Sequence, residues 1–108
     1  MEGRTHVKRT FAAIVERTSK WDQSKPAQEQ DGFEHHAKYM GDLEADGLIR
    51  LAGLMLGSTD VLFILEAESE EEVQTRLGQD PWRQDGHTRL VRLEEIAIRT
   101  WAPLTGAP

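Results

Sequence analysis

The order in which two apolar patterns follow one another restricts the fold of this chain more than any other feature. A period of two residues predicts a strand, whereas recurrence at three and four residues predicts one face of a helix. The strand-like patterns cover residues 7–16, 48–56, 60–67 and 88–101. The helical patterns cover about 30–46 and 70–78. The predicted order is therefore strand, helix, strand, strand, helix, strand.

Both predicted helices carry recognisable end signals. The apolar stripe of the first helix consists of Phe33, Ala37, Met40 and Leu43. Gly47 follows the stripe and suits the left-handed conformation of a helix C-terminus. The second helix opens with a capping box, in which Ser69 accepts from the third helical N–H and Glu72 reaches back. The acidic residues of this turn suit the positive end of a helix, so we assign them no binding role.

The connections between the elements are also informative. Residues 57–59 form a short turn with one glycine, which favours an antiparallel hairpin between the two middle strands. The last strand changes its apolar phase after Leu93, so we predict a bulge near Glu94 and Glu95. The polar stretch 17–32 is long for a connection, and we expect its single large apolar residue, Trp21, to line a pocket or to pin the loop to the core.

The element order predicts an α+β fold of the ferredoxin-like βαββαβ type, with a four-stranded antiparallel sheet and two helices on one face. Strands that are apolar on both sides predict that the other face is covered as well. A second copy of the same face is the simplest cover, so we predict a homodimer. We expect one domain over residues 1–108, with a core at 7–101 and a loosely ordered tail at 102–108.

Composition excludes several classes of function. The chain has 108 residues and a net charge of −6, so its field repels nucleic-acid backbones and anionic lipids. RNA-recognition domains share the element order but need stacked aromatic residues on basic strands, and this sheet offers only Phe11 and Phe63. There is no cysteine and no apolar run of the roughly 20 residues that span a membrane. We expect a cytoplasmic protein that binds neither nucleic acid nor membrane.

One histidine is predicted to face inward. His36 lies four residues before Met40 and seven before Leu43, so it shares their stripe, whereas His35 is rotated by about 100° toward solvent. Taken alone, such a residue is more often a core histidine with one satisfied nitrogen than a catalyst. The two adjacent histidines diverge on a helix and no His-x-x-x-His pair is present, so we expect neither a metal site nor a cofactor.

Several short motifs occur in the order and spacing of a known family. They are His36-Ala37-Lys38-Tyr39-Met40, Glu44-Ala45-Asp46-Gly47, Leu51-Ala52-Gly53, Glu68-Ser69, and Asp80-Pro81-Trp82 followed by Gly86. With these motifs the chain resembles the YCII-related (YciI-like) family of the dimeric α+β barrel superfamily, over roughly residues 7–101. The resemblance implies a ferredoxin-like fold and a dimer.

The resemblance also implies a site. Members of the family are thought to use the helix histidine and the loop aspartate as a dyad, which nominates His36 and Asp80. A carboxylate bonded to one imidazole nitrogen fixes the tautomer and leaves the other nitrogen to move a proton. Asp80 precedes Pro81, which disfavours the α region and would hold the carboxylate on an extended corner after the second helix. Without the resemblance, Asp80 reads as a turn-forming residue.

The expected function is acid–base chemistry of the lyase or isomerase type on a small molecule, because some relatives act on hydroxylated, chlorinated aromatic rings. Trp21, Tyr39 and Trp82 are candidates for the lining of the pocket, although packing alone also explains them. The alternative is a non-catalytic ligand-binding or regulatory module of the same topology. What discriminates between the two is whether His36 and Asp80 meet in a pocket.

Overall fold

The fold is that of a computed structural model, which describes residues 7–106. The first six residues, with His6, and the last two residues of the predicted tail lie outside the described part. The strands are β1 (Arg9–Arg17), β2 (Ile49–Leu54), β3 (Val61–Ala67) and β4 (Thr88–Ile96). They form one antiparallel sheet in the order β2-β3-β1-β4. Within the described residues, the predicted α+β, ferredoxin-like fold is confirmed.

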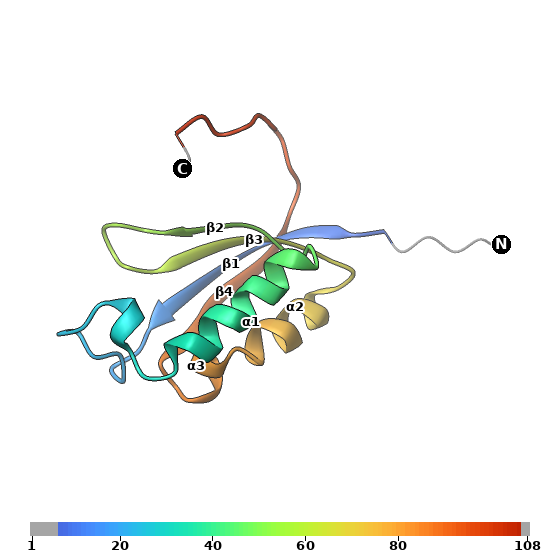
Figure 1. The fold of residues 1–108 in the computed structure, drawn as a ribbon. Helices are drawn as coiled ribbons and strands as arrows, with labels where there is room; N and C mark the ends of the chain where they lie inside the picture. The colour runs from blue at the N-terminus through green and yellow to red at the C-terminus, as the bar shows by residue number, and fades with distance from the viewer. Residues whose placement is uncertain (1–6, 107–108) are drawn as a thin grey trace.

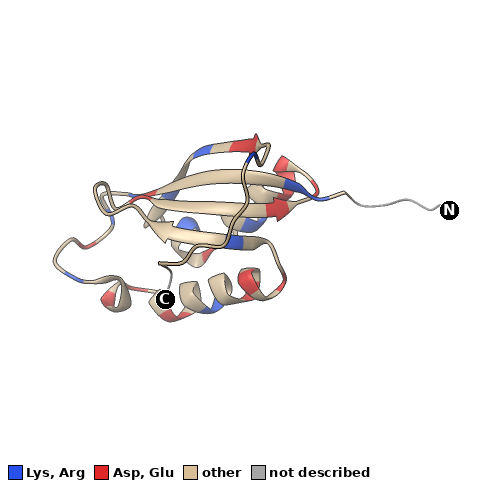
Figure 2. Cartoon of the chain, turned by 90° about the horizontal axis from the view of Figure 1, so that it is seen from above, with Lys and Arg blue, Asp and Glu red and all other residues tan. Residues whose placement is uncertain are grey.

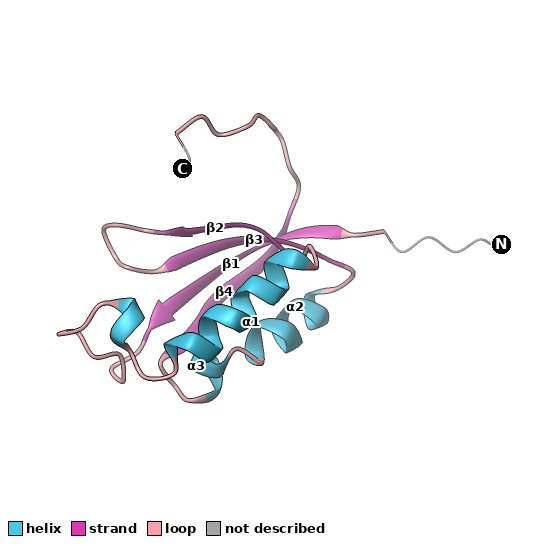
Figure 3. Ribbon diagram, viewed as in Figure 1, coloured by secondary structure: helices cyan, strands magenta, loops and turns pink. Residues whose placement is uncertain are grey.

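The helices lie together on one face of this sheet (Figures 1 and 3). They are α1 (Phe33–Ala45), α2 (Glu70–Gly78) and the short α3 (Pro81–Gln84), with a 3-10 turn η1 (Ala27–Glu29) in the long loop after β1. The predicted cap of α2 is confirmed for Ser69, which accepts from the backbone N–H of Glu72, whereas the Glu72 carboxylate reaches back one residue further and accepts from the N–H of Glu68. The helix α3 was not predicted.

The first helix differs from its prediction in two details. It begins at Phe33, about three residues late, because Gln30 belongs to the loop and is buried there. The Gln30 side-chain amide bonds the backbone of Asp22 and Lys25, which holds the loop closed. Ala37 is exposed and does not belong to the buried face. Gly47 has the predicted positive φ, at 90°.

The predicted bulge in the last strand exists, but at another residue. The register between β1 and β4 shifts at Ile14/Val15, opposite Val91, whereas Glu94 and Glu95 pair regularly. The shift turns Leu90 and Leu93 toward the core and leaves Val91 51% exposed. The strand also ends at Ile96, five residues earlier than predicted.

The core lies between the sheet and the helices. Its buried members from the two central strands are Phe11, Ala13, Val15, Phe63, Leu65 and Ala67, and those from α1, α2 and the start of β2 are Leu43, Val73, Leu77, Leu48 and Ile49. These positions alternate along each strand, as expected for a sheet with one face against helices. The alternation of buried residues thus identifies the face of the sheet that packs against the helices.

The other sheet face carries apolar side chains between the core positions. Ile14, Leu62 and Ile64 are only half-buried, and none of the described helices covers them (Figure 1). The chain after β4 leaves the sheet on this side, where Trp101 is 84% exposed. Basic and acidic residues lie among one another in the loops, on the helices and at strand ends (Figure 2). No helix in residues 7–106 is long and apolar enough to cross a membrane.

Candidate functional site

Asp80 occupies the corner between α2 and α3. It is the N-cap of α3, where its Oδ1 accepts the backbone N–H of Trp82 at 3.1 Å, and Pro81 takes the first helical position. Its φ and ψ of −58° and 127° lie outside the α region, as the following proline requires. The corner geometry predicted from the sequence is therefore present, and the carboxylate is held in place by its own helix cap.

The same carboxylate oxygen bonds the histidine of α1. The distance from His36 Nδ1 to Asp80 Oδ1 is 2.8 Å, although the two residues are 44 positions apart in sequence. Asp80 is 7% exposed and the His36 ring is mostly buried. A carboxylate can only accept, so Nδ1 carries the hydrogen at this bond, and in the neutral form of the ring Nε2 is left with its lone pair. Among the described residues, no hydrogen bond to Nε2 is formed.

The indole ring of Trp82 packs against one face of the His36 imidazole. The ring of Trp82 stacks on that of His36, with centroids 3.7 Å apart and planes inclined by 15°. Trp82 is buried, and its Nε1–H donates to the backbone carbonyl of Asp31 at 2.8 Å, which anchors the indole to the loop before α1. The imidazole is therefore held by one hydrogen bond in its plane and by one stacking contact against its face.

These residues form part of the wall of a cavity of about 310 Å³. Most of the wall is apolar and comes from the sheet, α1 and α2, with Val15, Phe63, Met40 and Leu77 among its residues. Its charged or titratable side chains are Glu16, Arg17, His36, Glu44, Asp80 and Arg83. An apolar cavity with a few convergent polar groups is the usual form of a small-molecule site.

The three aromatic residues expected near the pocket have different positions. Trp82 and Trp21 both line the cavity, in edge-to-face contact with centroids 5.0 Å apart, and both are buried. Tyr39 is not among the lining residues. Its hydroxyl donates to the carbonyl of Arg76 at 2.8 Å and lies 3.2 Å from Oε1 of Gln79, so it joins α1 to α2. Burial raises the pKa of Tyr39, which keeps the hydroxyl protonated for this role.

A second histidine–aspartate pair lies behind Trp82 and was not predicted. His87 Nδ1 is 2.7 Å from Asp85 Oδ1, and the His87 ring is buried about 6 Å from the indole of Trp82. Burial of Asp85 opposes ionisation, but its bonds to His87 and the nearby positive charge of Lys20 hold the pKa of this carboxyl below its usual value. His87 does not line the cavity. The pair instead closes the turn between α3 and β4.

Arg83 is the lining residue that sequence reasoning missed. It lies on α3, whose four residues are too few to show a helical period. Its Nε is buried and has no hydrogen-bond partner among the described residues. Burial lowers the pKa of Arg83, and the charge of Asp80 opposes that shift. Nowhere in residues 7–106 do three His, Asp or Glu side chains come together in a way that could hold a metal ion.

Comparison of the sequence with known protein families shows where the chain belongs. Residues 11–97 match the model of the YCII-related domain. The chain belongs to the YCII-related family. No curated protein is similar enough to the chain to count as a match. In this YCII-related protein, the helix histidine and the loop aspartate of the sequence motifs are the two residues that the fold joins in the cavity wall.

Proposed function

We propose that this YCII-related protein is an enzyme that performs general acid–base chemistry on a small, hydroxylated aromatic compound, in a reaction of the lyase or isomerase type. His36 carries the proton and Asp80 orients it. The observation that supports this proposal best is the 2.8 Å bond between His36 Nδ1 and Asp80 Oδ1 in the wall of an apolar cavity. A histidine that served the core alone would not need a wall position beside empty space.

In the proposed reaction each group has a separate part. The lone pair on Nε2 takes a proton from a hydroxyl or an acidic carbon of the substrate, and the imidazolium then forms beside the Asp80 carboxylate and over the Trp82 indole. Both neighbours favour the positive ring, the carboxylate by charge and the indole through its π face. Return of the proton to another atom completes an isomerisation, and its delivery to a leaving group completes an elimination.

The apolar wall supports an aromatic substrate. Trp21, Phe63 and Trp82 offer ring surfaces, and Met40 and Leu77 complete an interior from which water is displaced when a ligand binds. Exclusion of water strengthens the interaction between the imidazolium and Asp80 during the reaction.

We further propose that the protein works in the cytoplasm as a single-domain homodimer in which two copies pack through the open sheet face. The half-buried Ile14, Leu62 and Ile64 on that face support this arrangement, because such a surface gains free energy when it is covered. In this proposal, the substrate and a second copy of the chain are the partners.

The orientation of His36 can be tested before a substrate is known. The long-range ¹H–¹⁵N NMR spectrum of the neutral rings should show His36 as the Nδ1–H tautomer, whereas exposed His35 should show the Nε2–H form that predominates in water. Asp80→Ser should return His36 to the ordinary form, because a serine still caps α3 but is too short to hold the ring. An Nε2–H tautomer of His36 in the wild type would contradict the proposed role of Asp80.

The chemistry is tested by turnover. Hydroxylated and chlorinated aromatic compounds should be incubated with the wild type and with His36→Gln in D₂O, with product and deuterium incorporation followed by NMR. Loss of the proton carrier should lower any turnover about 10²- to 10⁴-fold. If His36→Gln converts or exchanges every active compound as fast as the wild type does, the non-catalytic binding module becomes the better description.

A further inference from the structure

One cation of the cavity wall forms no hydrogen bond and no ion pair with the described residues. Arg83 lies three residues after Asp80 and lines the cavity, and its Nε is buried without a hydrogen bond in the described part of the chain. No carboxylate of these residues forms an ion pair with its guanidinium. Arg83 is half-buried, and its buried Nε–H has lost its bond to water without gaining another, which is unfavourable for a charged donor. A ligand that accepts hydrogen bonds would remove this cost.

The acidic residues of the cavity wall do not supply the missing partner, and among the described residues no ion pair joins Glu44 to Arg83. Glu16 pairs with Arg89 of β4, and Asp80 is bonded to His36 and to the backbone of α3. Arg17 lies with its guanidinium carbon 4.1 Å from the ring centroid of Trp21, and no carboxylate among the described residues pairs with it either. Two guanidinium groups therefore line the cavity without a carboxylate partner in the described part of the chain.

We propose that the substrate carries a carboxylate that Arg83 binds through its guanidinium, so that the apolar body lies against the cavity wall and the reacting atom lies at His36. A guanidinium presents parallel N–H donors that match the two oxygens of a carboxylate, which fixes orientation as well as position. The location of the reacting atom rests on the proposed acid–base function, whereas the anion site does not.

The charge of the wall favours a carboxylate over a phosphate. Glu16, Glu44 and Asp80 line the same cavity as the two arginines. These carboxylates repel a dianion about twice as strongly as a monoanion at the same place, and one guanidinium is enough to neutralise a monoanion. Arg83, on α3, and His36, on α1, line the same cavity as Asp80, so a small aromatic acid bound in this cavity would have both groups in the surrounding wall.

Benzoate and its neutral analogue benzamide provide the test. Each is titrated into ¹⁵N-labelled protein, and binding is followed through the indole N–H of Trp82, which lies in the cavity wall. We expect benzoate to bind with millimolar affinity and benzamide to bind at least tenfold more weakly. Arg83→Gln should weaken benzoate about tenfold or more and leave benzamide unchanged.

Matched variants keep this test specific. Arg83→Lys retains the charge but not the fork, so its benzoate affinity should lie between those of the wild type and Arg83→Gln. Arg50→Gln removes an exposed arginine that pairs with Glu66 outside the cavity, and it should leave benzoate binding unchanged. The ¹H–¹⁵N spectrum of each variant shows whether the fold is retained.

Three results would overturn the proposal: equal affinity for benzoate and benzamide, unchanged benzoate affinity in a folded Arg83→Gln, or no benzoate binding at about 10 mM. The His36→Gln variant distinguishes the proposed anion site from the proposed reaction. Benzoate binding should persist in that variant, so loss of the acid–base function would leave the anion site standing. Failure of the anion site would in turn leave the His36 tautomer experiment unaffected.

Discussion

Asp80 uses one carboxylate oxygen for two tasks. Its Oδ1 accepts from the backbone of Trp82, which starts α3, and from the ring of His36. The first bond depends only on an acceptor of suitable length, whereas the second depends on reach and charge. Substitutions at this position can therefore separate the fold of the corner from the state of the histidine.

The sequence predicted individual site residues unevenly. The helical stripe placed His36 inward and His35 outward, because a period of 3.6 residues separates neighbours by a fixed angle. The meeting with Asp80 was expected only from the family motifs, since no local rule joins residues 44 positions apart. Arg83 was not predicted as a cavity residue, because nothing in the sequence around a single arginine indicates that it is partly buried. Tyr39 shares the helix with His36 but turns to α2, and its hydroxyl bonds are invisible in a sequence pattern.

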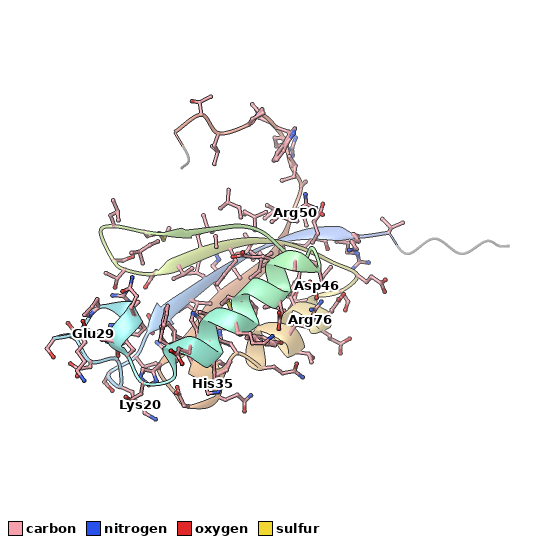
Figure 4. All side chains as sticks on the ribbon, viewed as in Figure 1. Lys20, Glu29, His35, Asp46, Arg50 and Arg76 are labelled. Atoms are coloured by element: carbon pink, nitrogen blue, oxygen red, sulfur yellow. The ribbon has the colours of Figure 1, made fainter. Side chains whose placement is uncertain are left out.

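A charged contact at the end of α1 should make stability depend on pH. Asp46 pairs with Arg76 of α2 (Figure 4), and its bond to that guanidinium holds the pKa of the Asp46 carboxyl below its usual value. A lowered pKa in the folded state stabilises the protein above the unfolded-state value, and this stabilisation is lost as the pH falls through the folded-state value.

We therefore expect Asp46→Asn to lower the free energy of unfolding at neutral pH by up to about 1 kcal/mol, since the pair is partly exposed. The difference from the wild type should shrink toward zero as the pH falls below about 4. Urea unfolding at several pH values measures it. Asp42→Asn, which removes an exposed i,i+4 contact with Lys38, serves as the control. An undiminished difference in acid would assign the effect to the Asn side chain and not to the charge.

Elements with their own local signals were predicted best. The two long helices and the hairpin carried end signals and periodicity, and each was found close to its predicted position. The bulge was predicted at the wrong residue because the sequence pattern allows either Leu90 or Val91 to be the inward-facing residue of the strand. Only the pairing of Leu90 with Val15 in the sheet decides for Leu90. The short α3 was missed because it consists of a proline start and an aspartate cap without an apolar stripe of its own.

The cap of α2 gives a prediction at this scale. Ser69→Ala removes the acceptor of the Glu72 N–H bond and should destabilise the protein by about 1 kcal/mol. Ser69→Asp keeps an acceptor and should remain within a few tenths of a kcal/mol of the wild type. Thr75→Ala, on the exposed side of the same helix, is the control. Chemical denaturation measures all three, and equal stability of Ser69→Ala and wild type would show that the cap contributes nothing.

At the scale of the whole molecule, the open sheet face determines the expected assembly. Its half-buried apolar residues lie on the central strands, opposite the helices, so two copies can cover one another through a twofold axis. Exposed Trp101 follows β4 on the same side and is available to the second copy.

Ile64→Glu places a charge in the middle of that face and should convert the proposed dimer into a monomer. Light scattering coupled to gel filtration at micromolar concentration measures the mass. Gln74→Glu adds the same charge to the exposed side of α2 and should remain dimeric. A wild-type protein that is itself monomeric would refute the proposed covering of the sheet.

The double task of Asp80 also bears on how such a protein can change over evolutionary time. A single-base change in its codon produces Asn, which caps helices as well as Asp does and retains an oxygen for the Trp82 N–H. Such a descendant would keep its fold, its cavity and its ability to bind, while the negative charge beside His36 disappeared. The proposed catalysis could thus be lost at this position under selection for folding alone, and a lineage of binding proteins could arise from such enzymes without passing through an unfolded intermediate.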